Sequence, residues 1–388
     1  MPGTFIISLD CEGKWGIADR DSRIESGFIT RSALIRAYES LLRVLSVYEA
    51  SATFAFVMAL TLTKNELDEW MPRLTDVQVE GVNWMRNFRR AEAAGDLDGW
   101  FCPEAFDLVR DSGLHEIGCQ GFRHVPLGNC EVGREEAGYE LRSATELAKR
   151  KGVDLKTFVF PRNSVGHLGL LADQGYAGFR NAHPIVGRHG RLGNLAREFN
   201  IREVSQDPEP SASGLVSIPG GYFLNWRQGL RRVIPEAVTL MRWRSILNDA
   251  VANDRVALLY SHPHNLIDGP GTLELSEGVL RIASQLRESK SLAIVTQAEY
   301  CAGFVQGRAY SHPRSNGTTH RRSPLPKKRQ LWDQTRQAKL GNCLYGDFEV
   351  KGGFRGLRFL FCMDAFDALG LAVLIDGTRS ARAMGACR

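Results

Sequence analysis

The chain of 388 residues lacks several features that would place it in a special class of protein. It has no run of about 18 uninterrupted apolar residues, so we expect no membrane-spanning helix. Its eight cysteines are scattered without a C-x-x-C pair, which argues against a disulfide framework or a zinc knuckle. The first residues show no basic region, long apolar core or small-residue cleavage site. We therefore expect no secretory signal peptide and a cytoplasmic location.

The positive charge of the chain is confined to its C-terminal part. The formal net charge is +5, yet residues 308–388 alone hold 15 basic and 6 acidic side chains. Residues 308–342 are rich in Arg, Lys, Ser, Pro and Thr and show no apolar periodicity, which is typical of a linker. We predict a domain over 1–306 and a basic, disordered extension over 307–388, with no nucleic-acid partner. The sequence leaves the oligomeric state open.

Strands and helices alternate through the first 300 residues. Apolar runs predict strands over 4–9, 52–57, 115–119, 156–161, 176–180, 216–219, 256–260 and 292–296. Helical periodicity predicts helices over 31–48, 135–151, 166–175 and 278–288. Such alternation indicates an α/β fold, either a parallel barrel or a doubly wound sheet. The charged, Trp-rich segment 62–113 interrupts the pattern as an insertion.

Polar residues follow the carboxyl ends of several predicted strands. In a parallel barrel these ends meet on one face, where active sites are built. The polar pairs are Asp10 with Glu12, Gln120 with His124, Arg162 with Asn163, and His262 with His264.

The first pair consists of two carboxylates spaced two residues apart. On a strand, Asp10 and Glu12 leave the same face. One carboxylate can then bind a metal ion while the other accepts a proton from water. The alternative is an exposed turn with ordinary acidic residues.

The middle pairs carry weaker signals. Gln120 and His124 are four residues apart and could face one ion on a helix, although a lone histidine is more often simply hydrogen-bonded. A zincin motif is excluded, because Cys119 stands where H-E-x-x-H needs its second histidine. Arg162 could bind a carboxylate or phosphate, or form a surface salt bridge.

The last pair ends an apolar strand with two histidines on either side of Pro263. Imidazole has a pKa near neutrality and suits general acid catalysis. His262 and His264 could instead bind a metal together or pack structurally.

In this order, the elements resemble the polysaccharide deacetylases, the NodB-homology carbohydrate esterases. The resemblance spans residues 4–305. It is carried by Leu9-Asp10-Cys11-Glu12, Ala52-Thr53-Phe54, His115-Glu116-Ile117-Gly118 with His124, Phe160-Pro161, and the late strand ending at His262. Further stretches are similar to the branch from bacterial surface-polysaccharide biosynthesis clusters, namely Ser8–Gly16, Phe160–Asn163, Gly221–Trp226 and His262–Leu266.

The resemblance implies a distorted (β/α)7 NodB-type barrel and a divalent metal, usually zinc. It implies that Asp10 is the catalytic base and His262 the general acid. It further places an oxyanion donor at the backbone N–H of Arg162. The implied metal ligands are Glu12, His124 and Gln120, and the implied substrate-binding residues are Trp226, His264, Asn163 and Tyr222.

Three positions depart from the family pattern. Gln120 replaces the first metal histidine, and an amide oxygen is a poorer zinc ligand than imidazole. Val159 stands where the family has the arginine that steadies the base. Glu12 replaces an aspartate and is one methylene longer.

The resemblance implies a hydrolase that removes an N-acetyl group from an amino sugar. Without a signal peptide, we expect a cytoplasmic nucleotide- or lipid-linked precursor as substrate, with segment 62–113 shaping the entrance. Two alternatives stay open. One is an amidohydrolase for a non-sugar amide such as a cyclic ureide. The other is a non-catalytic carbohydrate-binding relative that has lost its metal through Gln120.

Overall fold

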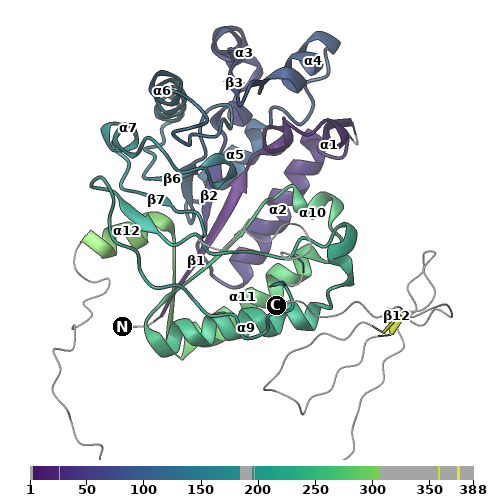
Figure 1. Cartoon of the computed structure of the whole chain (residues 1–388), viewed down its shortest axis with the longest axis vertical. Coiled ribbons are helices and arrows are strands. Elements are labelled where there is room, and N and C mark those ends of the chain that lie inside the picture. Colours follow the sequence, from purple (N-terminus) through teal and green to yellow (C-terminus); the bar gives the residue numbers. More distant parts are fainter. Residues whose placement is uncertain are drawn as a thin grey trace, which may run out of the picture. The chain divides into compact units, whose positions relative to one another are not determined.

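The computed structural model describes residues 3–25, 27–183, 195, 197–289 and 291–305, together with 357–358 and 374–375 (Figure 1). The chain divides into two units, Met1–Pro313 and Arg314–Arg388. In the second unit, β12 (Leu357–Arg358) pairs antiparallel with β13 (Leu374–Ile375). The rest of the predicted basic extension lies outside the described residues.

The first unit is built on one parallel sheet of nine strands, which confirms the predicted α/β class. Its strands are mostly buried apolar runs, as expected for a parallel sheet covered on both faces. Along the ladder they are β8 (Val216–Ile218), β7 (Gly178–Arg180), β6 (Thr157–Val159), β5 (Glu116–Cys119), β2 (Thr53–Phe56), β1 (Gly3–Cys11), β10 (Val256–Ser261) and β9 (Tyr222–Phe223), with β11 (Leu292–Val295) pairing with β1.

The two edges of this sheet are formed by one continuous stretch of chain. β8 and β9 stand at opposite ends of the ladder, yet only Pro219–Gly221 separates them in sequence. Three residues span roughly 10 Å at most, so the sheet must curl until its edges come close. Gly221, at φ +66°, has Leu258 so near that an added Cβ would lie 2.4 Å from its carbonyl oxygen. The curl therefore requires glycine at this position.

Helices cover the outside of the curled sheet, and α9 and α11 lie on the opposite side of it from α3 and α4 (Figure 1). α2 begins after Thr30, whose hydroxyl accepts a hydrogen bond from the Ala33 N–H, and it buries Leu34, Tyr38 and Leu41. The longer helices are α2 (Arg31–Val47), α5 (Pro103–Ser112), α6 (Arg134–Arg150), α9 (Glu236–Asn253) and α11 (Thr272–Glu288). The shorter α-helices are α1 (Asp21–Glu25), α3 (Lys64–Trp70), α4 (Arg86–Ala94), α7 (Leu168–Asp173), α10 (Asn265–Asp268) and α12 (Gln297–Val305).

Short 3-10 turns follow several strands, namely η1 (Gly13–Ile17), η2 (Met58–Thr61), η4 (Pro161–Asn163) and η5 (Gly229–Val233), and η3 (Met71–Arg73) follows α3. Among the described residues, no helix is both long and apolar enough to cross a membrane. The described cysteines, Cys11, Cys102, Cys119, Cys130 and Cys301, are all free.

The insertion 62–113 folds into α3, α4, α5 and the hairpin of β3 (Gln78–Val79) with β4 (Val82–Asn83). Its aromatic residues pack against η1: Trp15 stacks on Phe88 at a centroid distance of 4.9 Å and meets Trp100 edge-on at 4.9 Å. The Trp15 indole N–H also donates to the Trp100 carbonyl at 2.8 Å. These contacts of the insertion thus hold η1 in place.

Candidate active site

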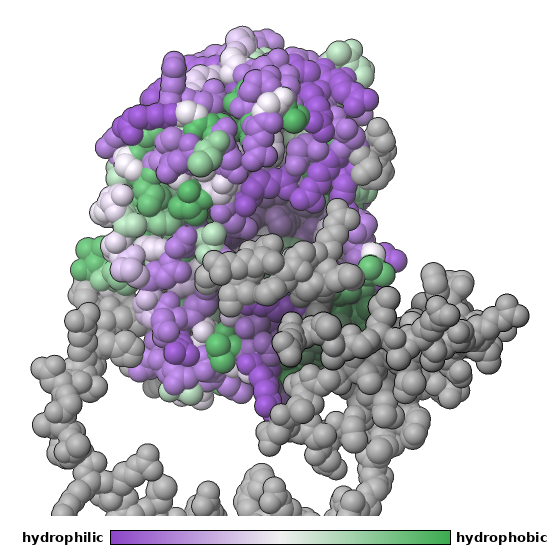
Figure 2. Space-filling view, viewed as in Figure 1, coloured by the Kyte–Doolittle hydropathy of each residue, from purple (hydrophilic) through white to green (hydrophobic). Residues whose placement is uncertain are grey.

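The predicted polar pairs converge on one cavity of about 420 Å³ at the carboxyl ends of the strands. Figure 2 shows a hydrophilic hollow in the middle of the face drawn there. Residues from β1, β7 and β10 and from the loops after β5, β6 and β9 form the walls. Of the predicted site residues, those that line the cavity are Asp10, Glu12, Gln120, His124, Arg162, Asn163, Trp226, His262 and His264. No residue of the insertion 62–113 is among the lining residues of this cavity.

Asp10 is held by an arginine that the sequence analysis did not single out. The Arg180 guanidinium, at the end of β7, donates to both carboxylate oxygens of Asp10 at 2.7 Å. It also donates to the Ser8 hydroxyl at 2.8 Å. Arg180 thus takes the place expected for the arginine missing at Val159, but from the neighbouring strand. A bidentate pair of this kind fixes the carboxylate in one orientation.

Three nitrogen atoms gather around one oxygen of Glu12. Its Oε1 lies 2.9 Å from Nε2 of Gln120, 3.1 Å from Nε2 of His124 and 3.5 Å from Nε2 of His262. A Cβ on Gly16 would lie 1.8 Å from Glu12 Oε2, so η1 passes directly over this carboxylate. Glycine at position 16 is therefore needed for Glu12 to point into the cavity.

Charge coupling ties Glu12 to the two imidazoles. Burial alone would raise the pKa of Glu12, but the charges and hydrogen bonds of His262 and His124 hold the pKa well below its usual range. Burial alone would lower the pKa of His262, yet Glu12 first and Asp10 second raise this pKa above its ordinary value. The cavity therefore favours an ionised Glu12 beside a protonated His262.

The two histidines after β10 differ in what surrounds them. His262 Nε2 lies 3.9 Å from Asp10 Oδ2, and its Nδ1 is 3.3 Å from the Asn265 amide nitrogen. His264 is buried, and burial, with the charge of His262 second, lowers its pKa to about 3. His264 is thus neutral near pH 7, and His262 is the histidine able to carry a proton to a substrate.

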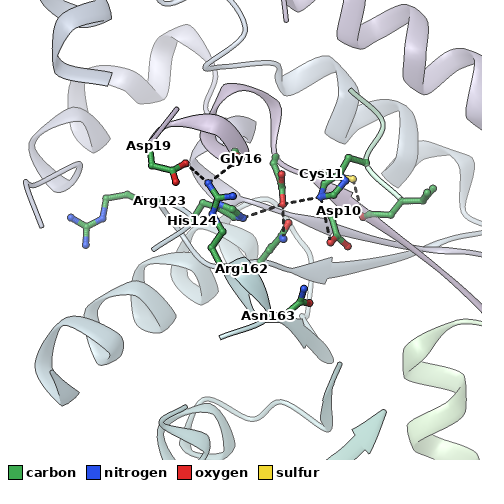
Figure 3. Close-up of polar contacts among 12 residues, drawn as sticks. Asp10, Cys11, Gly16, Asp19, Arg123, His124, Arg162 and Asn163 are labelled. Carbon is green, nitrogen blue, oxygen red and sulfur yellow. Dashed lines mark hydrogen bonds and ion pairs between the residues drawn. The ribbon is translucent and has the colours of Figure 1, made fainter. Parts of the chain in front are cut away.

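The backbone is strained at the cavity wall. Positive φ angles occur at three residues, with +61° at His124, +59° at Arg162 and +55° at Asn163. Residues other than glycine rarely adopt this region. Figure 3 shows the Arg162 side chain reaching to Asp19 and to the Gly16 carbonyl. This side chain is thereby occupied in fastening η4 to η1. Strain of this kind is maintained where the surrounding structure imposes it, commonly at functional sites.

Trp226 lines the cavity as expected, whereas Tyr222 does not. The Arg23 guanidinium lies 4.3 Å from the centroid of the Trp226 ring, and the Trp226 N–H donates to Asp268 at 3.1 Å. Tyr222 is buried and its hydroxyl donates to the Val204 carbonyl at 2.8 Å. Because side chains alternate along β9, Phe223 faces the cavity in its place.

The residues present suit a divalent metal ion. Asp10, Glu12 and His262 each offer a ligand atom within 4.8 Å of the others. Carboxylate and imidazole are donors that zinc and related ions accept. In addition, Oε1 of Gln120 is buried and has no hydrogen-bond partner among the described residues. Since Arg180 already engages both oxygens of Asp10, Glu12 is the more available of the two carboxylates.

Comparison with known proteins finds solved structures that are similar to this chain. No protein-family model and no curated protein sequence matches the chain. Among solved structures, a candidate polysaccharide deacetylase from Mycobacterium smegmatis is 14% identical, with a TM-score of 0.50 over 83% of this chain and 94% of that one.

Two further structures were also found. An allantoinase is 10% identical, with a TM-score of 0.44 over 79% of this chain and 92% of that one. A CE4 domain of a xylanase from the hindgut metagenome of Trinervitermes trinervoides is 12% identical, with a TM-score of 0.37 over the same shares. With the match to the mycobacterial structure, the curled parallel sheet shows that this chain has the fold of the polysaccharide deacetylases.

Proposed function

We propose that the protein is a divalent-metal-dependent hydrolase that removes an N-acetyl group from an amino sugar, with zinc as the metal and a precursor of a bacterial surface polysaccharide as the substrate. The observation that carries the proposal is the pairing of Asp10 with Arg180 beside Glu12 and His262 in one cavity. A proton acceptor and a proton donor thus stand on either side of a candidate metal position. Amide hydrolysis requires both groups.

Glu12 and His124 would hold the metal, with the amide of Gln120 alongside. When bound, such an ion would supply polarisation of the acetamide carbonyl and lower the pKa of water. Arg180 holds Asp10 in place and directed toward the cavity. Asp10 then accepts the proton of the attacking water.

His262 delivers a proton to the departing amine. Its position beside both carboxylates favours the protonated form before the reaction. The Asn265 amide at Nδ1 fixes the plane of the ring. In this role the His262 Nε2, now 3.5 Å from Glu12 Oε1, turns toward the substrate, and the metal is left to Glu12 and His124.

The remaining lining residues bind the substrate. Trp226 offers an aromatic face to the sugar, and Asn163 offers an amide. The strained peptide at Arg162 would present a backbone N–H to the oxyanion that forms on the carbonyl oxygen. Fixed dipoles of this kind stabilise developing charge without reorganising during the reaction.

One observation favours a non-catalytic carbohydrate-binding protein as a second candidate. Gln120 donates its amide N–H to Glu12, whereas a histidine at position 120 would bind a metal ion. The two histidines and this amide together satisfy the Glu12 charge from within the protein. On this alternative the three nitrogens take the place of the metal.

Metal analysis and an activity assay on one sample separate the candidates. The purified full-length protein is titrated with Zn²⁺ by calorimetry and then incubated with acetylated amino sugars and with a cyclic ureide. Release of acetate at a stoichiometry of one metal supports the deacetylase. Ureide hydrolysis alone would support the amidohydrolase, and absence of both metal and turnover would support the binding protein.

Gln120→His sharpens this test. Imidazole is a better zinc donor than an amide, so we expect the Kd for Zn²⁺ to fall about tenfold or more, which is about 1.4 kcal/mol per factor of ten. An unchanged Kd would show that position 120 does not face the ion. Activity that appears only in the variant would identify the natural chain as a degenerate enzyme.

A further inference from the structure

Arginine is the commonest charged residue of the cavity wall. Five arginines line it: Arg20, Arg23, Arg162, Arg180 and Arg231. The acidic lining residues are Asp10 and Glu12. Arg180 is already paired with Asp10, so the other guanidinium groups decide the charge that a ligand meets.

Three of these arginines pair with carboxylates that do not line the cavity. Arg162 pairs with Asp19, Arg23 with Asp268 at 3.7 Å, and Arg231 with Glu198 at 3.1 Å. None of these three acidic residues belongs to the cavity lining. The lining thus contains these three guanidinium groups but not their acidic partners, and the surface that a ligand meets is positive.

Arg231 is held in place by a network that carries excess positive charge. Its partner Glu198 is buried and also binds Arg242 Nη1, while Arg242 Nη2 lies 3.5 Å from Glu203. Arg197 is 3.3 Å from that same Glu203. Among the described residues, three arginines therefore share two carboxylates, which leaves one positive charge unmatched.

The position of Arg231 brings this charge next to the reacting groups. Its guanidinium lies over the Phe223 ring, 5.4 Å from the centroid, and Phe223 lies 5.6 Å from the His262 ring. On the α1 side, Arg20 is exposed and makes no ion pair with any residue that the structure describes. Two cations are thus available to a ligand in the cavity. Arg231 is held in position by its ion pair, and Arg20 is exposed.

We infer that the substrate is an anionic amino sugar, one that carries a phosphate or a carboxylate bound by Arg20 and Arg231. This inference rests on the proposed deacetylase function and specifies its substrate class. Guanidinium binds both anions through paired N–H donors. A neutral glycan makes no use of these charges, whereas an anionic one gains charge-assisted hydrogen bonds from them.

Binding is measured by calorimetry with the full-length protein, so that the result does not depend on turnover. The probes are N-acetylglucosamine, N-acetylglucosamine 1-phosphate, N-acetylmuramic acid and inorganic phosphate. We expect at least one anionic sugar to bind about tenfold or more tightly than N-acetylglucosamine, the equivalent of about 1.4 kcal/mol. The tighter of the two anionic sugars identifies phosphate or carboxylate as the preferred group.

Variants assign the effect to the two arginines. Arg20→Gln and Arg231→Gln should each remove most of the preference for the anionic sugar, measured as the ratio of its affinity to that of N-acetylglucosamine in the same variant. Arg36→Gln, an exposed position on α2 outside the cavity, is the matched control. Thermal unfolding confirms folding of each variant, and Arg20, being exposed, is the substitution least able to disturb it.

Equal affinity for neutral and anionic sugars in the wild type would overturn the inference. So would a preference that survives in both Arg20→Gln and Arg231→Gln. If an anionic sugar binds through these arginines but no acetate is released, the anion site stands and the proposed hydrolase function is the part that fails.

Discussion

Arg123 and Arg180 are the two most deeply buried arginines that the structure describes, and they are used in opposite ways. Arg123 has 0% of its surface exposed and Arg180 has 2%. Each of the three side-chain nitrogens of Arg123 has an acceptor, provided by Glu140, Glu136 and Thr75. Arg180 is bidentate to Asp10, but its Nε has no hydrogen-bond partner among the described residues, and its partner carboxylate lines the cavity.

The difference shows which pair is structural. Glu140 also accepts the backbone N–H groups of Phe122 and Arg123 at 2.8 and 2.9 Å, so the Arg123 network fastens the chain between Gln120 and His124. Figure 3 shows Arg123 pointing away from the cluster at His124. Arg180 holds one carboxylate that a substrate can still reach. An arginine whose nitrogens are all hydrogen-bonded within the protein, such as Arg123, belongs to the scaffold. An arginine whose partner carboxylate lines the cavity, such as Arg180, belongs to the site.

The largest effect is expected from Asp10→Asn. The amide cannot accept a proton from water, so kcat should fall about 10²–10⁴-fold, the range typical of a positioned general base. Metal content should stay the same, because Asp10 is committed to Arg180. Steady-state kinetics and metal analysis of the same preparation check this. Wild-type kcat, or loss of the metal, would contradict the assigned role.

His262→Ala should lower kcat by a similar order, about 10²–10⁴-fold, with a smaller change in KM. His264→Ala should cost much less, since burial keeps the His264 pKa at about 3 and the ring neutral. Parallel kinetics of the two variants decide between them. A larger kcat loss at position 264 would reverse the assignment.

Glu140→Gln tests the scaffold side of the comparison. It removes the buried carboxylate of Arg123 and leaves only the pair with Glu136, and breaking a buried ion pair costs about 3–5 kcal/mol of unfolding free energy. We expect a large fall in the denaturation midpoint and little change in kcat of the folded fraction. Asp10→Asn should give the opposite pattern. If both variants lose stability equally and activity equally, the distinction between the two arginines fails.

His183 provides a smaller, pH-dependent effect. Burial, with the charge of Arg197 second, lowers its pKa to about 4, so the folded protein keeps the ring neutral while the unfolded chain protonates near pH 6.5. Its contribution to stability is present above pH 6.5 and is lost as the pH falls toward 4. Between pH 7 and 5 the loss amounts to about 2 kcal/mol. Denaturation midpoints should therefore drop less over this interval in His183→Gln than in the wild type.

The smallest effect is expected from ending the chain after Gly307. The charge of residues 308–388 differs from that of the preceding part, and α12 closes the first unit at Val305. Unfolding temperature and kcat of the shortened protein should match those of the full chain. Insolubility of the shortened protein would show that the apolar run over 354–375 is needed by the first unit.

Much of the fold could be predicted from local patterns. Each predicted strand has a counterpart, and α2 and α6 differ from the predicted helices by one residue at an end. The two-residue β9 was missed because so short a strand has no period to detect, and α9 because its apolar residues do not form one narrow stripe. The orientation of Tyr222 has the same origin, since only the pairing with β10 decides which side of β9 faces the cavity.

The sequence by itself determined the alternation of elements and the polar residues at the strand ends, because both depend on neighbours along the chain. Only the tertiary structure decided which of those residues meet. Arg180 lies 170 residues from Asp10, and Arg231 reaches the cavity through Glu198 and Phe223. An arginine at a strand end looks the same in sequence whether it faces solvent or a buried acid. The partner is chosen by the order of strands in the sheet, which no local pattern encodes.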